Sequence, residues 1–199
     1  MITSIFKRIG LLLAIVVALA ACGSEAPYTF QGGTIDQTML APDFALQDQN
    51  GSTFRLSEQV GKVVLVFFGF THCPDFCPTT MSDFKAVKQQ LGADAERVRF
   101  VMITVDPERD TTAVVRQYLT AFDPTFTGLV PTAEQLPKLL SDYNINVEKD
   151  APDANGNYNV GHSSLTYAID RTGQLRLAYP MGMGSAMMLP DVKYLLRGR

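Results

Sequence analysis

The stretch of sequence that decides the fold is VVLVFFGFTHCPDFCP, residues 63–78. Its first six residues form a continuous run of β-branched and aromatic side chains, which predicts a strand buried on both faces of a central sheet. Gly69 ends this strand, and apolar residues recur at helical spacing from Met81 to Leu91 before a stop at Gly92. Both cysteines of the stretch are therefore predicted in a strand-to-helix turn, close to a helix N-terminus.

The rest of the chain predicts further strands and helices on either side of this stretch. On the N-terminal side, apolar and polar residues alternate around the turn Asn50-Gly51, which predicts a β-hairpin. The C-terminal side predicts a buried strand (98–105), two helices (111–122 and 133–143), an inserted hairpin (147–160), two strands (164–169 and 175–179) and a last helix (187–197). This order predicts an α/β protein with a thioredoxin-like fold, an N-terminal β-hairpin and an inserted hairpin before the last strands.

The N-terminal residues are typical of a secretory signal. Lys7 and Arg8 precede an uncharged run, residues 9–21, that is shorter than the ~20 apolar residues needed to span a bilayer. The run ends in Leu19-Ala20-Ala21-Cys22, which resembles a bacterial lipobox, in which a cysteine is lipidated before cleavage. Two other interpretations stay open: an ordinary signal with an incidental cysteine, and an uncleaved short anchor.

These features predict a lipoprotein signal peptide over residues 1–21, a tether over residues 22–40 and a single globular domain over residues 41–199. Roughly 160 residues are enough for one domain with its own core. All three interpretations of the N-terminus put this domain outside the cytoplasm. The predicted location is the extracytoplasmic, periplasmic side of a bacterial membrane, with a lipid on Cys22 as the anchor.

The charge of the chain argues against a polyanionic partner. Cleavage before Cys22 removes Lys7, Arg8 and no acidic residue, which takes the formal net charge from −3 to −5. A mildly acidic domain lacks the electrostatic signature of a nucleic-acid-binding protein. The sequence also contains no polybasic run for anionic lipid. Membrane attachment is therefore expected to depend on the N-terminus.

The chain has three cysteines. If Cys22 is lipidated, Cys73 and Cys77 remain as one pair in an oxidising compartment, where a structural disulfide is the ordinary expectation. A disulfide across so short a loop removes little chain entropy and would stabilise the fold only slightly. The pair is better suited to redox chemistry or to a metal ion.

The spacing of Cys73 and Cys77 favours a metal. Residues i and i+4 lie on one face of a helix, and the N–H groups at a helix N-terminus favour thiolates, the form that binds metals. Thiol oxidoreductases of this fold usually have two residues between their cysteines, whereas here there are three, which leaves room for an ion. Soft thiolates with one imidazole suit Cu(I) or Zn(II).

The only histidines in the sequence are His72 and His162. In thioredoxin-like folds, the loop before the strand predicted at 164–169 usually holds a cis-proline packed against the cysteines. Here that loop is Gly161-His162-Ser163-Ser164, so His162 is predicted as the third ligand. A hydrogen-bonded loop histidine is the alternative. His72 adjoins Cys73 and is expected to point away from the metal, as a spectator or as a partner of a ligand.

Three separated motifs resemble the SCO/SenC family. They are residues 69–78, residues 105–111, and Gly161-His162-Ser163-Ser164 followed by Tyr167 and Ile169-Asp170. The resemblance runs from about residue 41 to the C-terminus. Thr112 departs from the family, which commonly has proline there, and the lipobox replaces the transmembrane helix of many members. These departures alter a loop and the anchor and leave the proposed ligands in place.

The resemblance implies a thioredoxin-like fold that binds one copper ion, Cu(I) or Cu(II), through Cys73, Cys77 and His162. It also implies a copper chaperone that helps to build the binuclear copper centre of cytochrome c oxidase, by delivering copper or by reducing the cysteines of that centre. The expected partner is the copper-containing subunit of the oxidase or another copper chaperone.

Two further features are candidates for secondary roles. Asp106 follows a central strand, at the edge where ligands collect in open α/β sheets. By resemblance it is placed near the metal, as a carboxylate that contacts Cu(II) or a ligand; an Asp that caps a turn is the equal alternative. Methionines crowd residues 181–188, at Met181, Met183, Met187 and Met188. These methionines could bind copper as auxiliary ligands or form a surface for a partner, but methionine more often simply packs in the protein.

The leading hypothesis is a metal-binding assembly factor that is not a turnover enzyme. The rival is a thiol-disulfide oxidoreductase that uses Cys73 and Cys77 catalytically. The three-residue spacer and His162 favour the first. A peroxidase-like member ranks last, because the loop lacks the expected threonine and arginine arrangement. The first two readings can coexist, since a site that releases copper exposes a dithiol.

Overall fold

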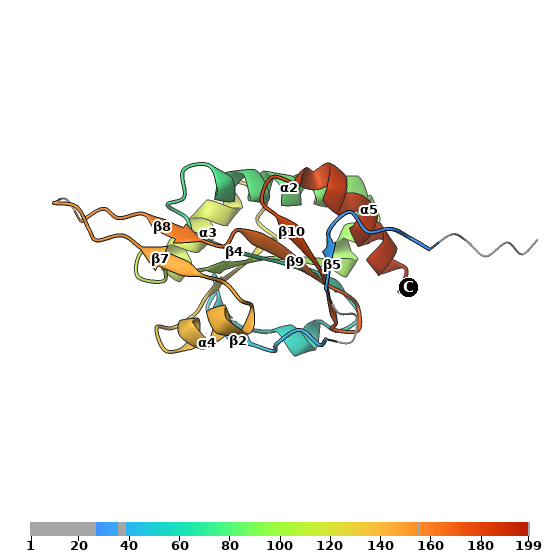
Figure 1. Cartoon of the computed structure of the whole chain (residues 1–199), viewed down its shortest axis with the longest axis horizontal. Coiled ribbons are helices and arrows are strands. Elements are labelled where there is room, and N and C mark those ends of the chain that lie inside the picture. The colour runs from blue at the N-terminus through green and yellow to red at the C-terminus, as the bar shows by residue number, and fades with distance from the viewer. Residues whose placement is uncertain (1–26, 36–38, 155, 199) are drawn as a thin grey trace, which may run out of the picture.

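The computed structural model describes residues 27–35, 39–154 and 156–198. Its main feature is an eight-stranded mixed sheet with the strand order β1-β10-β9-β4-β5-β6-β2-β3. Helices α2, α3 and α5 cover one face of this sheet, and α4 lies on the other (Figure 1). The predicted α/β class is confirmed.

Strand β4 (Val63–Gly69) lies at the centre of the sheet, and all seven of its residues are buried. It pairs in parallel with β5 (Val98–Thr104) and antiparallel with β9 (Leu165–Ile169). Both faces of β4 are covered, which explains why its sequence is a continuous apolar run. The prediction of a doubly buried strand at this position is confirmed.

The outer strands extend the sheet in both directions. On one side lie β10 (Leu175–Pro180) and β1 (Gly33–Thr34), and on the other lie β6 (Thr127–Val130) and the predicted N-terminal hairpin, β2 (Ala45–Asp48) with β3 (Thr53–Arg55). Strand β6 was not predicted, because it has only four residues, one of which is Gly128. A Cβ added there would lie 2.2 Å from Val115 Cγ1, so Gly128 allows helix α3 to pack closely on β6.

The helices are α2 (Phe76–Leu91), α3 (Thr112–Thr120), α4 (Gln135–Asp142) and α5 (Gly184–Leu196). Short 3-10 helices follow β3 (Leu56–Gln59) and α2 (Gly92–Arg97). The prediction for the last helix is wrong at its start, because α5 begins at Gly184 and Pro190 lies inside it. The buried side chains of Met188, Val192 and Leu195 hold this helix against the sheet, which offsets the missing main-chain hydrogen bond.

The inserted hairpin is also present. Strands β7 (Val147–Lys149) and β8 (Val160–His162) form a separate two-stranded sheet. Figure 1 shows this hairpin projecting at one end of the molecule, far from the C-terminal end of α5. Because His162 closes β8, the hairpin positions the histidine predicted as a ligand.

Part of the predicted tether needs correction. Strand β1 pairs with β10, and the buried Asp191 carboxylate of α5 accepts hydrogen bonds from the Tyr28 hydroxyl and from the N–H groups of Gln31 and Gly32. These contacts hold residues 27–35 against the domain, since a buried carboxylate requires such donors. Residues 1–26 lie outside the described part of the chain, as does Cys22. Among the described helices, none has the length and apolar character needed to cross a membrane.

Candidate metal centre

The two cysteines lie where β4 passes into α2. Cys73 belongs to the loop before the helix and is partly exposed, whereas Cys77 is the second helical residue and is fully buried. Both are free thiols. The Cys77 N–H points at Cys73 Sγ at 3.4 Å, so the sulfur of Cys73 caps the first turn of α2 in place of the usual side-chain oxygen. The predicted strand-to-helix turn is confirmed.

Burial controls the chemistry of Cys77. It raises the pKa of this thiol well above its ordinary value, and the hydrogen bond with the Phe70 backbone offsets only part of the shift. The expectation that the helix N-terminus favours a thiolate is therefore wrong for Cys77. A buried thiol keeps its proton at neutral pH until a cation takes the proton's place.

A pocket of about 330 Å³ opens beside the cysteine loop. Cys73 and His162 both line it, although they are far apart in the sequence. The other lining residues are Phe70, His72, Pro74, Asp75, Phe76, Tyr158, Asn159, Val160, Gly161, Ser164 and Met181. The fold thus brings the predicted histidine to the same cavity as the exposed sulfur.

His162 is positioned as a neutral imidazole. Burial lowers the pKa of its ring, and the Ser163 carbonyl only partly opposes this. Nδ1 lies 3.2 Å from that carbonyl oxygen, a contact that is a hydrogen bond when Nδ1 carries the proton. In this tautomer the lone pair of Nε2 is free to bind a metal. The rings of Phe67 and Phe70 stand edge-on around the imidazole.

The three predicted ligands, Cys73, Cys77 and His162, do not surround a common point in this structure. Within the part of the chain that the structure describes, no three Cys, His, Asp or Glu side chains lie close enough together to hold a metal ion. Cys77 does not line the pocket, because its sulfur is buried beneath the loop. A bound ion would therefore require the cysteine loop or the imidazole to move.

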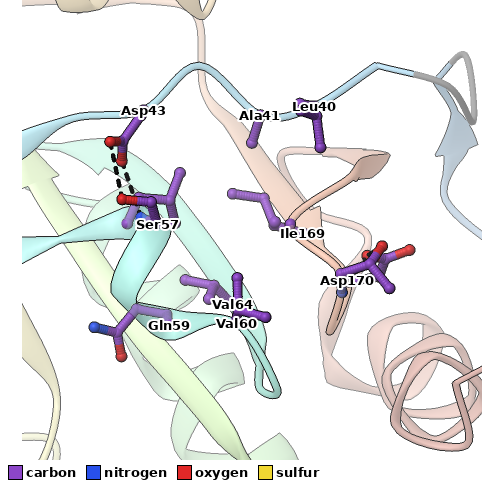
Figure 2. Close-up of a pocket in the computed structure, with 12 residues that line it drawn as sticks. Leu40, Ala41, Asp43, Ser57, Gln59, Val60, Val64, Ile169 and Asp170 are labelled. Carbon is purple, nitrogen blue, oxygen red and sulfur yellow. Dashed lines mark hydrogen bonds between the residues drawn. The ribbon is translucent and has the colours of Figure 1, made fainter.

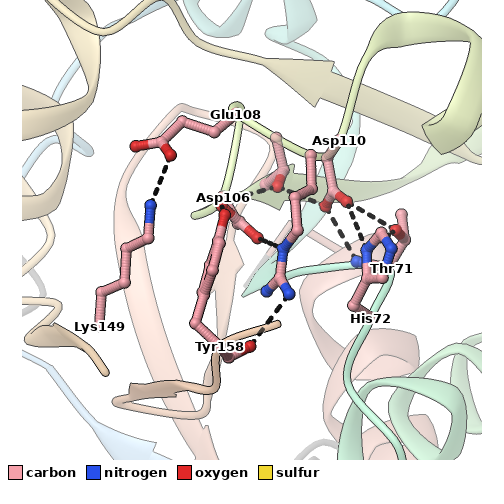
Figure 3. A network of polar contacts seen from close by, with 9 residues as sticks. Thr71, His72, Asp106, Glu108, Asp110, Lys149 and Tyr158 are labelled. Atoms are coloured by element: carbon pink, nitrogen blue, oxygen red, sulfur yellow. Dashed lines mark hydrogen bonds and ion pairs between the residues drawn. The ribbon is translucent and has the colours of Figure 1, made fainter. Parts of the chain in front are cut away.

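Asp110, to which the sequence analysis gave no role, fixes the loop that leads to Cys73. Its carboxylate is fully buried and accepts hydrogen bonds from the Thr71 N–H (2.9 Å), the Thr71 hydroxyl (2.6 Å) and the Thr104 hydroxyl (2.6 Å). Figure 3 shows Asp110 between this loop and the end of β5. Hydrogen bonds to a charged acceptor are among the stronger ones in proteins. Asp110 therefore restrains the path of residues 70–72.

Asp106 is also buried, and both of its carboxylate oxygens have partners. Oδ2 pairs with Arg109 Nε, and Oδ1 accepts from the Tyr158 hydroxyl at 2.8 Å (Figure 3). The Arg109 guanidinium lies 3.6 Å from the centre of the Tyr158 ring and donates to the Tyr158 carbonyl. Tyr158 lines the pocket and Asp106 does not. Asp106 therefore does not line the cavity itself and is linked to it only by its hydrogen bond with Tyr158.

Comparison with known proteins identifies the family of this chain. A model of the SCO1/SenC protein family matches residues 32–197. The chain belongs to the SCO1/SenC family. An SCO2-like protein of Rickettsia felis is 36% identical over 140 residues, which cover 70% of this chain and 68% of the relative.

Solved structures of SCO1/SenC proteins confirm the thioredoxin-like fold. Bradyrhizobium japonicum ScoI with copper bound is 36% identical, with a TM-score of 0.72 and coverage of 79% of this chain and 99% of that chain. Apo Sco1 of Thermus thermophilus is 35% identical, with a TM-score of 0.76 and coverage of 86% and 100%.

The remaining predicted residues of this SCO1/SenC protein occupy distinct places. His72 is half-exposed, and its Nδ1 lies 3.5 Å from Asp110 Oδ1, although the residue also borders the pocket. Met181 is exposed and lines the pocket, whereas Met188 is buried in the core. The four methionines thus do not form one cluster. Asp110 and Tyr158 could not be singled out from the sequence, because Asp110 bonds to Thr71, 39 residues away, and Tyr158 bonds to Asp106, 52 residues away.

Proposed function

We propose that this SCO1/SenC protein is a copper chaperone whose cargo, one copper ion, binds to Cys73, Cys77 and His162. The main support is the pocket that Cys73 and His162 share, with Cys77 hydrogen-bonded through its N–H to the Cys73 sulfur. Membership of the family and the copper held by Bradyrhizobium japonicum ScoI support the choice of metal. Family membership further implies delivery of copper to the binuclear centre of cytochrome c oxidase, or reduction of that centre's cysteines.

The donor set fits copper chemically. Two thiolates and one neutral imidazole are soft donors that suit Cu(I). The incoming cation would displace the proton of the buried Cys77 thiol, which would pass to the solvent, and the apolar rings around His162 would keep water away from the bound ion. Movement of the cysteine loop or the imidazole upon binding would make uptake and release a conformational step.

Copper stoichiometry and affinity test this proposal. The reduced chain, loaded anaerobically, should hold one copper per chain against a competing chelator. Cys73→Ala, Cys77→Ala and His162→Ala should each lose the tight site, because each removes one of three donors. His72→Ala is the matched control, since it removes the other histidine of the same pocket. Unchanged affinity in His162→Ala would contradict the proposed ligand set.

A second candidate function is thiol-disulfide exchange. The pair consists of an exposed thiol, Cys73, beside a buried one, Cys77, an arrangement suited to attack by the first and resolution by the second. In exchange, the Cys73 thiolate would attack a substrate disulfide, and Cys77 would release the reduced substrate while the pair becomes a disulfide. Rapid reduction of one test disulfide per reduced chain, without stoichiometric copper binding, would favour this function over copper binding.

We also propose that the protein is held at the extracytoplasmic side of a bacterial membrane by a lipid on Cys22. The support is the lipobox-like sequence at residues 19–22. Mass spectrometry of the mature chain would test it, because cleavage and acylation together give a defined N-terminal peptide. An N-terminal peptide that begins before Cys22 would contradict it.

A further inference from the structure

A basic hollow lies at the end of the molecule opposite the β7–β8 hairpin. Four cationic side chains and one carboxylate line this hollow of about 340 Å³, together with Leu196. The cations are Arg97, Arg171, Lys193 and Arg197. They come from the end of the 3-10 helix after α2, from the turn after β9 and from α5. The fold therefore concentrates positive charge locally in a chain whose net charge is −3.

Of these four cationic side chains, only Arg97 and Arg171 make hydrogen bonds or ion pairs with other described residues. Arg97 pairs with Asp94, and both Arg97 and Arg171 donate to the Leu196 carbonyl at the end of α5. These bonds satisfy a carbonyl that the helix leaves free. Lys193 and Arg197 are exposed, and no carboxylate of the described residues lies within ion-pair distance of either. Their charges are available to an external anion.

Exposed apolar side chains adjoin the basic hollow. Arg171 Nε donates to the Gly61 carbonyl, and the preceding residue, Val60, is 63% exposed. Val60 and Leu40, which is 67% exposed, line an apolar pocket whose far wall is the turn that carries Arg171 (Figure 2). The carboxylates in that pocket, Asp43 and Asp170, are engaged by Ser57 and Arg176. Cations beside exposed apolar side chains are typical of surfaces that bind a membrane interface.

The N-terminal segment reaches the domain beside this hollow. The Tyr28 ring stacks on Tyr194 of α5 with ring centres 4.2 Å apart, and the Tyr28 hydroxyl donates to the buried Asp191 carboxylate of the same helix. Burial and the Asp191 carboxylate raise the pKa of Tyr28 to about 12, and the positive charge of Arg197 opposes this shift. Arg197 therefore lies close to Tyr28. Four residues separate Cys22 from Pro27, so the two Cα atoms can lie at most about 18 Å apart when the chain is extended. An N-terminal anchor would thus hold the hollow close to the lipid headgroups.

We propose that this end of the molecule docks on an anionic bilayer surface, through Arg97, Arg171, Lys193 and Arg197 with Leu40 and Val60 beside them. The inference builds on the proposed membrane location, although docking itself does not need the lipid on Cys22, and it is independent of copper binding. Each Lys or Arg near an anionic leaflet favours the membrane-bound state roughly five-fold. Because the hairpin that carries His162 projects at the opposite end (Figure 1), docking turns the pocket of Cys73 and His162 away from the membrane, toward soluble domains of a partner.

Lysine labelling of the full chain tests the docking. The chain is reconstituted into vesicles of phosphatidylcholine alone or of phosphatidylcholine with phosphatidylglycerol, and a membrane-impermeant amine reagent is added. Lys193 should react roughly five-fold more slowly on the anionic vesicles, while Lys138 on α4 reacts equally on both. Raising NaCl from ~0.05 to ~0.5 M should remove the difference, because the Debye length shortens.

Matched charge reversals give the second arm. Arg197→Glu should abolish the protection of Lys193, whereas Lys85→Glu, the same charge change on α2, should leave it intact. Equal labelling of Lys193 on both vesicle types, or protection that survives Arg197→Glu and high salt, would overturn the proposal. The mass of the purified chain shows separately whether Cys22 carries lipid. If the chain proves unanchored, the same labelling with added vesicles still decides the docking question.

Discussion

Cys73 and Cys77 differ in exposure although only three residues separate them. The loop leaves the Cys73 sulfur at the rim of the pocket, and the first turn of α2 buries Cys77 against Gly69, whose added Cβ would lie 3.0 Å from the Cys77 sulfur. A side chain at Gly69 would therefore displace the thiol. The two sulfurs therefore differ in their access to the pocket.

We predict that alkylation modifies Cys73 first. Because burial raises the pKa of Cys77, little of its reactive thiolate is present near neutral pH. With the native reduced chain and iodoacetamide, peptide mass spectrometry should find Cys73 labelled at least ~10-fold faster than Cys77. The chain unfolded in urea is the control and should show similar rates. Equal rates in the native protein would contradict the buried position of Cys77.

A second residue-scale prediction concerns Asp110. Replacing it with Asn weakens three hydrogen bonds to a charged, fully buried acceptor, from Thr71 and Thr104. Asp110→Asn should therefore lower the free energy of unfolding by about 2–3 kcal/mol, measured by urea denaturation. Asp94→Asn is the control, because this carboxylate is exposed and makes one surface ion pair. A cost no greater than that of the control would refute the role of Asp110.

At the scale of elements, the β9–β10 hairpin is closed by one carboxylate. Asp170 accepts from the N–H and hydroxyl of Thr172, from the N–H of Gln174 and from the Arg176 guanidinium. Although burial alone would raise the pKa of Asp170, these donors outweigh it and lower the pKa below its ordinary value. The turn is thus held by the ionised form.

This pKa shift predicts how stability depends on pH. A carboxyl whose folded pKa lies below its unfolded value, about 3.9, stabilises the fold above that value and loses this contribution as pH falls through the folded pKa. Asp170→Asn should cost about 2 kcal/mol at pH 7 and progressively less below about pH 4. Unfolding free energies at pH 7 and below pH 4 would check this. A difference between the two proteins that does not change with pH would contradict it.

At the scale of the whole molecule, prediction from sequence succeeded where one segment carries its own signal. The run at residues 63–68 is apolar because both faces of the sheet are covered, and the turn residues Asn50-Gly51 predict the N-terminal hairpin. Strand β6 was missed because four residues around a glycine have too little periodicity. The start of α5 was missed because proline is typical of a first helical turn, so Pro190 suggested a helix that begins later in the chain, at residue 187, than the observed start at Gly184.

Features built from distant segments could not be predicted in the same way. The Asp110 network joins residues 71, 104 and 110, and the basic hollow gathers cations from positions 97 to 197. Each of these residues is unremarkable in its local sequence, and only the strand order brings them together. The position of His162 could be predicted because the topology of the fold places its loop beside the cysteine loop, and both His162 and Cys73 line the same pocket. Its role as a ligand stays a prediction.

X-ray absorption at the copper edge of the Cu(I)-loaded chain tests the central claim most directly. It reports the type and number of atoms bound to the metal. The proposal predicts two sulfur neighbours and one nitrogen neighbour, with the nitrogen lost in His162→Ala and retained in His72→Ala. A shell without nitrogen in the native chain, or a nitrogen that survives His162→Ala, would show that copper does not bind to the pocket as proposed.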